Sequence, residues 1–284
     1  MNVTASTTQE KRRGLLALLA AVLAVLAAIV LSGCSASSEG SGQPEGSQDA
    51  LAQIQQDGKI TFATEGTWSP WTFHDEDGNL TGYDIEVARA IAEQMGVEAE
   101  FVEGEWDGLF AGMDAGRYDA VANGVDVTEE RAEKYDFTDP YAYNRTVVIV
   151  RDDEDDINSM EDLAGKTTAN TLSSTYTQVA ESYGAETQGV DDLLQTIQLL
   201  EQGRIDATLN SEVVFYDYMA QHPDAKLKIA CIDPDTTSVA IPVVKGESSQ
   251  ALLDAMNAAL EELRASGRLA ELSNQFFGVD ITEQ

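Results

Sequence analysis

The spacing of apolar residues along the chain predicts alternating strands and helices. In residues 83–95 apolar side chains fall three or four positions apart, which predicts an amphipathic helix that Gly96 ends. In residues 59–64 apolar and polar side chains alternate, which predicts a strand. The same patterns predict further strands at 97–102, 118–122, 146–150, 166–170, 206–209, 226–232 and 239–244, and further helices at 107–115, 174–183, 191–202, 212–220, 250–265 and 269–277.

Strands that alternate with helices indicate an α/β fold with largely parallel strand pairing. The alternation falls into two blocks that meet near residue 145, so we expect two lobes. Spacing alone leaves open which lobe the C-terminal strand and helices join. Asp77-Gly78 is a hairpin turn signal, and Asp107 and Thr128 are the expected N-caps of the helices that follow them.

The N-terminus has the pattern of a secretory signal. Basic residues at 11–13 precede the apolar run 14–31, and small residues follow. The tetrad Leu-Ser-Gly-Cys at 31–34 resembles the lipobox of bacterial lipoproteins, which implies cleavage before Cys34 and a diacylglycerol on its sulfur. The alternative is an uncleaved anchor, because 18 residues can just span a bilayer. In both cases we expect a domain tethered to the outer face of the cell membrane.

The residues after Cys34 predict a flexible tether. Residues 35–48 consist of Ser, Gly, Glu, Gln, Ala and Pro, a composition that buries too little apolar surface to fold. We therefore divide the chain into a signal peptide at 1–33, a lipidated cysteine with a linker at 34–57, and a folded part beyond residue 57.

Charge and composition exclude several classes of partner. The 50 acidic and 17 basic residues give a formal charge of −33, which excludes nucleic-acid binding by phosphate neutralisation but permits a small zwitterion in a local pocket. Cys231 is the one cysteine besides Cys34, so no disulfide framework is expected. His74 and His222 lie far apart in the sequence, and we expect neither a metal site nor a cofactor.

The segment GYDIEVARAIA at 82–92 begins a series of motifs that continues to the C-terminus. In their order and spacing these motifs resemble family 3 of the bacterial extracellular solute-binding proteins, the amino-acid receptors of ABC importers. The resemblance covers essentially the whole folded part. The later motifs are Trp106-Asp-Gly, Gly116-Arg-Tyr-Asp-Ala-Val121, Thr128-Glu-Glu-Arg131, Tyr135-Asp-Phe-Thr-Asp-Pro-Tyr141, Leu163-Ala-Gly-Lys166, Gly203-Arg-Ile-Asp-Ala207, Ser266-Gly-Arg-Leu and Phe276-Phe277-Gly278.

The resemblance implies a type II periplasmic binding protein fold. In this fold two α/β lobes are joined by two crossing segments, and the ligand is bound in the cleft between them. Lobe one is expected at 58–144 plus 238–284, and lobe two at 145–237. Closure of the two lobes would bury the ligand.

The resemblance also assigns residues to the charged ends of an amino acid. Arg131 matches the arginine that binds the α-carboxylate, a role that suits the parallel donors of a guanidinium. The alternative is an exposed arginine paired with Glu129 or Glu130. Ser174 matches the hydroxyl residue with which lobe two holds the same carboxylate, and it also suits an ordinary helix N-cap. Gly124 matches a position whose carbonyl meets the ligand ammonium.

The side chain of the ligand has its own expected partners. Trp68 and Trp106 match the aromatic residues that enclose it, although an aromatic residue before a helix cap, such as Trp106, is often only a hydrophobic staple. Glu65 follows the first strand, where the family often has an acid near the ligand side chain or amine. A solvated loop acid is the alternative for Glu65.

Two positions depart from the common family pattern. Ser211 stands where lobe two usually supplies an aspartate for the α-ammonium, and Asp126 stands where lobe one usually has Ser or Thr. We expect Asp126 to bind the ammonium, while Ser174 and Ser211 contribute hydroxyls from lobe two. A register shift of one residue, which would give the role to Glu212, is the rival interpretation.

These expectations describe a monomeric, lipid-anchored receptor that delivers a polar amino acid to an ABC permease and catalyses no reaction. The segment EGTWSPWTF at 65–73 is similar to the cystine-binding subgroup, so cystine is the first expected ligand and glutamine the second. Acids in the cleft disfavour an acidic amino acid. Two alternatives use the same fold: an enzyme similar to cyclohexadienyl dehydratase, and an amino-acid sensor domain.

Overall fold

The structure is a computed structural model that describes residues 49–284. The predicted signal peptide, Cys34 and residues 35–48 of the predicted linker lie outside the described residues. None of the helices formed by residues 49–284 combines the length and apolar character that a bilayer span requires.

The first described helix, α2 (Ala50–Asp57), overlaps the end of the predicted linker. The Asp49 carboxylate caps it by accepting a hydrogen bond from the Leu51 N–H at 2.9 Å. Ile54 is buried in the core, and Gly58 ends the helix in the left-handed conformation. Ala50 and Leu51 also pack against this core, so the ordered part includes residues that the division of the chain assigned to the linker.

We use the name lobe one for the part of the structure that is built on a five-stranded sheet, in the order β4-β1-β5-β12-β6. The first strand, β1, pairs in parallel with β4 and β5, whereas β12 runs antiparallel to β5 and β6. The sheet is therefore mixed rather than largely parallel, and β12 brings the C-terminal segment into lobe one. The strands are β1 (Lys59–Thr64), β4 (Glu98–Glu103), β5 (Ala120–Val121), β6 (Tyr135–Phe137) and β12 (Pro242–Val244).

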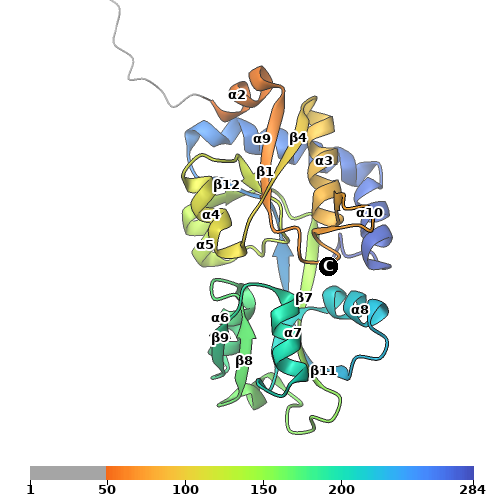
Figure 1. Cartoon of the computed structure of the whole chain (residues 1–284). Coiled ribbons are helices and arrows are strands. Elements are labelled where there is room, and N and C mark those ends of the chain that lie inside the picture. Colours follow the sequence, from red (N-terminus) through yellow and green to blue (C-terminus); the bar gives the residue numbers. More distant parts are fainter. Residues whose placement is uncertain (1–48) are drawn as a thin grey trace, which may run out of the picture. The chain divides into compact units, whose positions relative to one another are not determined.

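The helices of lobe one cover this sheet (Figure 1). The observed bounds of α3 are those that the apolar spacing predicts, and Thr128 caps α5 as expected. The N-cap of α4 is Glu105 rather than Asp107, which stands in the first turn, where a carboxylate still suits the helix dipole. These helices are α3 (Tyr83–Met95), α4 (Trp106–Asp114), α5 (Glu129–Lys134), α9 (Glu247–Ala265) and α10 (Arg268–Phe277).

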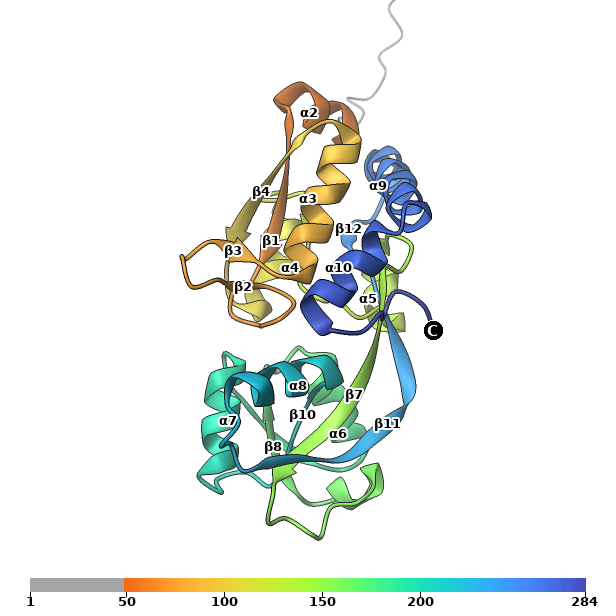
Figure 2. The ribbon, with the colours of Figure 1, turned by 90° about the vertical axis from the view of Figure 1, so that its right-hand side faces the viewer.

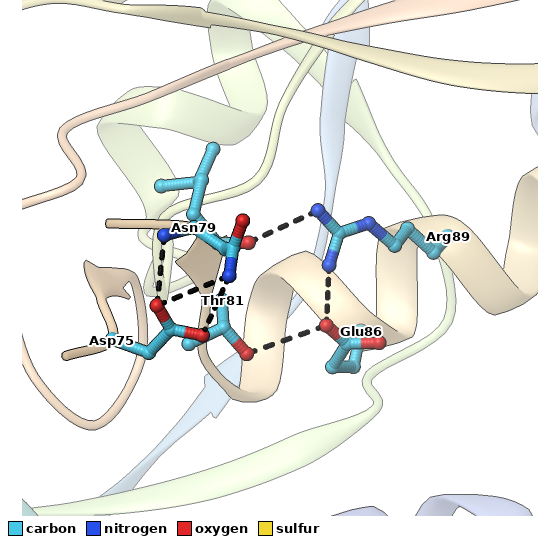
Figure 3. Close-up of polar contacts among 6 residues, drawn as sticks. Asp75, Asn79, Thr81, Glu86 and Arg89 are labelled. Carbon is cyan, nitrogen blue, oxygen red and sulfur yellow. Dashed lines mark hydrogen bonds and ion pairs between the residues drawn. The ribbon is translucent and has the colours of Figure 1, made fainter. Parts of the chain in front are cut away.

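A short hairpin, β2 (Phe73–His74) and β3 (Leu80–Thr81), joins β1 to α3. Its turn is closed by the Asp75 carboxylate, which accepts a hydrogen bond from the Asn79 N–H at 2.8 Å (Figure 3). Arg89 of α3 donates to the Leu80 carbonyl at 3.0 Å and pairs with Glu86 on its own helix (Figure 3). These contacts fix the hairpin against α3, and with it the preceding loop of residues 65–72.

Lobe two contains a three-stranded antiparallel sheet, in the order β10-β7-β11, and a parallel pair formed by β8 and β9. Its core consists of two apolar clusters that pack on the two sides of β7. The elements are β7 (Ala142–Arg151), β8 (Thr167–Asn170), β9 (Glu186–Gly189), β10 (Thr208–Ser211), β11 (Leu227–Val239), the 3-10 helix η1 (Met160–Leu163), α6 (Thr175–Ser182), α7 (Leu193–Glu201) and α8 (Glu212–Gln221).

Two long strands connect the lobes. Strands β7 and β11 pair antiparallel from Ala142↔Val239 to Arg151↔Leu227, and Figure 2 shows both running from lobe one into lobe two. Both are longer than the apolar runs at 146–150 and 226–232 predict, because their polar ends form the crossing segments. The Asp126↔Val239 bridge ties the end of β11 to lobe one.

Candidate functional site

A cavity lies between the two lobes, and residues of both lobes line it. Seven of the residues predicted for the site line it: Glu65, Trp68, Trp106, Gly124, Asp126, Arg131 and Ser174. The residues that sequence reasoning missed are Thr67, Asn123, Asn170, Thr171, Thr175, Tyr176, Asp192, Leu193, Thr196 and Asn210. Several of these residues end a strand or follow one, and this position in the chain was the one feature of the sequence that could have marked them as cavity residues.

Arg131 faces the cavity from the first turns of α5, whose Thr128 cap accepts its N–H at 3.2 Å. The guanidinium donates to the Asp126 carbonyl at 2.9 Å and to the Ser173 carbonyl at 3.3 Å. Glu130, the suggested alternative partner, pairs with Lys134 instead. Because Arg131 is bonded to neutral carbonyls, its positive charge remains available to an anion.

Two aromatic rings support this guanidinium. The Arg131 Cζ lies 5.2 Å from the centre of the Trp106 ring and 5.5 Å from that of Phe110, within cation–π range. Trp106 is 8 % exposed and packs edge-on against Phe110. Trp106 therefore lines the cavity and also holds Arg131 in place.

Asp126 is the most deeply buried charged residue of the cavity, with 4 % of its surface exposed. Its Oδ2 accepts a hydrogen bond from the Thr175 hydroxyl at 2.5 Å, and its Oδ1 accepts one from the Thr237 hydroxyl at 2.8 Å. Burial raises the pKa of Asp126, while these hydrogen bonds and the charge of Arg131 oppose the rise. Within the described part of the chain, the side chains that bond directly to the Asp126 carboxylate are thus neutral.

Gly124 lies between these groups and Trp68. Its φ of 56° favours glycine, and a Cβ there would come within 2.5 Å of the Trp68 ring. Its N–H donates to the buried carboxylate of Asp84, which also accepts a hydrogen bond from the Tyr141 hydroxyl at 2.8 Å. Asp84 therefore anchors the loop that carries Gly124 and Asp126.

Trp68 connects the two lobes. Its ring stacks on Trp71 at 5.6 Å, and its Nε1–H donates to the Asn210 Oδ1 of lobe two at 3.3 Å. It therefore forms an aromatic wall of the cavity from the loop after β1.

Glu65 and Asp192 are two further carboxylates that line the cavity, one from each lobe. Glu65 accepts a hydrogen bond from the Asn123 Nδ2 at 2.6 Å. Burial raises the pKa of Glu65 to about 7, and the charges of Asp192 and Asp107 add to the shift. Asp192 caps α7 by accepting the Gln195 N–H at 2.8 Å, so its sequence signal was that of a helix cap.

The predicted hydroxyl residues of lobe two lie in different places. Ser174 lines the cavity and also caps α6, accepting the Thr177 N–H at 3.2 Å. Ser211 is fully buried outside the cavity lining, and its hydroxyl donates to the Asn144 Oδ1 at 2.6 Å. Glu212 pairs with Arg145 of β7 and is likewise absent from the cavity lining.

The sequence profile described as "Bacterial extracellular solute-binding proteins, family 3" matches residues 60–279. The chain belongs to this family. A "Probable amino-acid ABC transporter-binding protein" of Haemophilus influenzae is 40 % identical over 231 residues, 81 % of this chain and 89 % of that protein. The L-cystine-binding protein TcyA of Bacillus subtilis is 36 % identical over 267 residues, 93 % of this chain and 98 % of that protein.

Solved structures show the same fold. An ancestral arginine-binding protein bound to arginine has a TM-score of 0.73 and 36 % identity, covering 78 % of this chain and 99 % of its own. The L-cystine solute receptor of Neisseria gonorrhoeae, in an unliganded open conformation, has a TM-score of 0.58 and 40 % identity, covering 83 % of this chain and 100 % of its own. These likenesses confirm the type II periplasmic binding protein fold and an extracytoplasmic protein that binds amino acids for an ABC transporter.

The pKa of Glu65 gives a prediction for stability. Its folded-state pKa of about 7 lies above the ordinary 4.5, so between these pH values the folded protein retains a proton that the unfolded chain has lost. This group therefore lowers the free energy of unfolding as the pH rises from 5 to 8. The free energy of unfolding of Glu65→Gln, measured by urea unfolding, should therefore rise by about 1–3 kcal/mol relative to that of wild type over this pH range.

The matched control for this prediction is Glu76→Gln, which removes an exposed carboxylate of the β2–β3 turn. Its difference from wild type should stay constant between pH 5 and 8. An equal pH trend for the two variants would contradict the assignment of the titration to Glu65.

Proposed function

We propose that this protein binds L-cystine between its lobes and passes it to an ABC permease, as a monomer anchored to the outer face of the cell membrane by a lipid on Cys34. The B. subtilis and N. gonorrhoeae relatives named for cystine support the ligand. The lipobox-like tetrad and the apolar run before it support the anchor. Glutamine is the second candidate ligand.

The observation that carries the proposal is a pair of opposite charges that face one cavity, neither of which forms an ion pair with another residue of 49–284. The Arg131 guanidinium donates to carbonyls, and the Asp126 carboxylate accepts from hydroxyls. A bound amino acid has a carboxylate for the first group and an ammonium for the second. Because a closed cleft excludes water, such complementary charges are the ones that a zwitterion requires.

Other residues complete the main-chain subsite in this proposal. Ser174 donates its hydroxyl to the ligand carboxylate from the N-terminus of α6, where free N–H groups favour an anion. The carbonyl of Gly124 accepts from the ammonium. Ser211 acts indirectly, because its hydroxyl fixes Asn144, which in turn donates to the Tyr176 hydroxyl of the cavity wall at 3.2 Å.

The remaining acids favour a ligand with a second positive group. Glu65 and Asp192 line the cavity, and neither forms an ion pair with another described residue. A second ammonium, which cystine has and glutamine lacks, offsets their charge, whereas an acidic side chain would be repelled. Trp68 and Trp106 enclose the apolar part of the ligand.

We further propose that the protein catalyses no reaction. One structural relative, with 29 % identity and a TM-score of 0.72, is described as an ancestral amino-acid-binding protein that preceded cyclohexadienyl dehydratase. Relatives named for transport support a binding role here. Incubation with each ligand candidate, followed by mass spectrometry, should return the ligand unchanged.

A thermal-shift screen of the twenty amino acids and cystine tests the ligand. A ligand at one hundred times its dissociation constant should stabilise the protein by about 2.7 kcal/mol. When all ligands are screened at the same concentration, the one that binds most tightly therefore gives the largest shift. We expect L-cystine to rank first and calorimetry to confirm one site per chain. A first rank for arginine or glutamine would refute cystine, and no shift with any amino acid would refute the proposed class.

The ammonium partner is tested by two carboxylate-to-amide substitutions. Asp126→Asn leaves the ligand ammonium without its anion, which typically costs about 2–5 kcal/mol, or at least thirtyfold in affinity. Glu212→Gln, the matched control, removes an acid that pairs with Arg145 outside the cavity and should change affinity less than threefold. If calorimetry ranked the two variants in the opposite order, the ligand ammonium would be bound by lobe two and not by Asp126.

A further inference from the structure

The first turn of α6 is the place where lobe two touches the charged residues of lobe one. Thr175, the first residue of the helix, donates its hydroxyl to the Asp126 Oδ2 at 2.5 Å. The neighbouring Ser173 donates to the Asp107 Oδ1 at 2.5 Å, and its carbonyl accepts from Arg131 at 3.3 Å. The groups that face the ligand in lobe one are therefore also contact points for lobe two.

Asp126 receives its second hydroxyl from a different part of the chain. Thr237 lies near the end of the crossing strand β11 and donates to the Asp126 Oδ1 at 2.8 Å. This end of β11 is bonded to the same loop of lobe one, because the Val127 N–H donates to the Ser238 carbonyl at 2.8 Å. Thr237 is therefore held beside Asp126 by a side-chain hydrogen bond and by a backbone hydrogen bond of the next residue.

The two hydroxyls leave room for a ligand. A carboxylate has about four acceptor positions, and the threonines occupy one on each oxygen. Asp126 is 96 % removed from solvent, so its charge depends on the donors that the protein and the ligand supply. A hydroxyl that contacts the charged carboxylate lowers the cost of this burial.

We propose that Thr175 and Thr237 are positioning residues that hold the Asp126 carboxylate for the ligand ammonium, and that Thr175 alone links this recognition to cleft closure. The inference rests on the proposed function of Asp126. Thr237 orients the carboxylate before lobe two arrives. Thr175 reaches it only when the lobes close, so ligand binding and closure strengthen each other through one carboxylate.

The two threonines should therefore have different kinetic effects. Valine has nearly the same shape as threonine but no hydroxyl, and hydrogen bonds to charged groups are worth about ten- to hundredfold in an equilibrium constant. Thr175→Val should weaken binding by this factor through faster dissociation, because its contact forms after the ligand has entered. Thr237→Val should also slow productive association, because its contact is part of lobe one when the ligand first meets it.

The experiment measures affinity by calorimetry and rate constants by stopped-flow tryptophan fluorescence, with L-cystine or the best ligand of the screen. Thr175→Ser keeps the hydroxyl and should stay within about threefold of wild type. The matched control is Thr187→Val, which removes a hydroxyl of lobe two that bonds to Thr168 away from the cavity. In an Asp126→Asn background, the effect of Thr175→Val should shrink to about threefold or less.

Several outcomes would overturn the proposal. Thr175→Val could bind like Thr187→Val, Thr175→Ser could lose as much affinity as Thr175→Val, or the Thr175→Val effect could persist in full beside Asp126→Asn. If Thr175→Val does not fold, judged by circular dichroism, the comparison of Thr175→Ser and Thr237→Val with wild type decides the matter. Failure of wild type to bind any amino acid would instead refute the proposed function itself.

Discussion

The site depends on one short segment, a loop and the helix α5 that follows it, which places two opposite charges beside the same cavity. Asp126 and Arg131 lie five residues apart, and the guanidinium of Arg131 donates to the carbonyl of Asp126 rather than to its carboxylate. The two charges therefore stay fixed relative to each other without neutralising each other. Asp84 holds the start of this loop through Gly124, and the end of β11 holds its middle through Val127.

This arrangement gives a physical reason for the two-lobe design. In the proposed function, lobe one by itself supplies a group for each end of a zwitterion but leaves both ends in contact with water, where charge–charge contacts are weak. Lobe two adds hydroxyls, the N-terminus of α6 and the Asn210 partner of Trp68, and it excludes water. In the proposed function, the ligand contacts both lobes only in the closed state, so its binding energy favours closure.

Much of the fold could be predicted from the sequence, because local rules and tertiary packing agree there. The apolar spacing and Gly96 fix both ends of α3, and the family motifs identify Arg131 and Trp68 as residues of the cavity. The length of β11 could not be predicted, because its polar end is ordered by pairing with β7 rather than by its own pattern. Helix α2 falls in residues that the division of the chain assigned to the linker.

The packing of the lobes also explains why some residues of the cavity could not be predicted from the sequence. Asp192 and Thr175 carry only the signal of a helix N-terminus, and their place in the cavity follows from how lobe two docks on lobe one. Ser211 occupies a position that the family pattern associates with the ligand, but its hydroxyl is taken by Asn144. The sequence indicated which helix or strand each of these residues belongs to. Which of their side chains line the cavity is decided by the packing of the lobes.

The central claim is that Arg131 and Asp126 together bind the two charged ends of an amino acid. Calorimetry on wild-type protein tests it most directly, by comparing the best ligand with its α-carboxamide and its N-acetyl derivative, modified at both ends if the ligand is cystine. Each derivative removes the charge that one of the two residues requires, so each should bind at least thirtyfold more weakly. A derivative that bound within threefold of the parent amino acid would contradict the account.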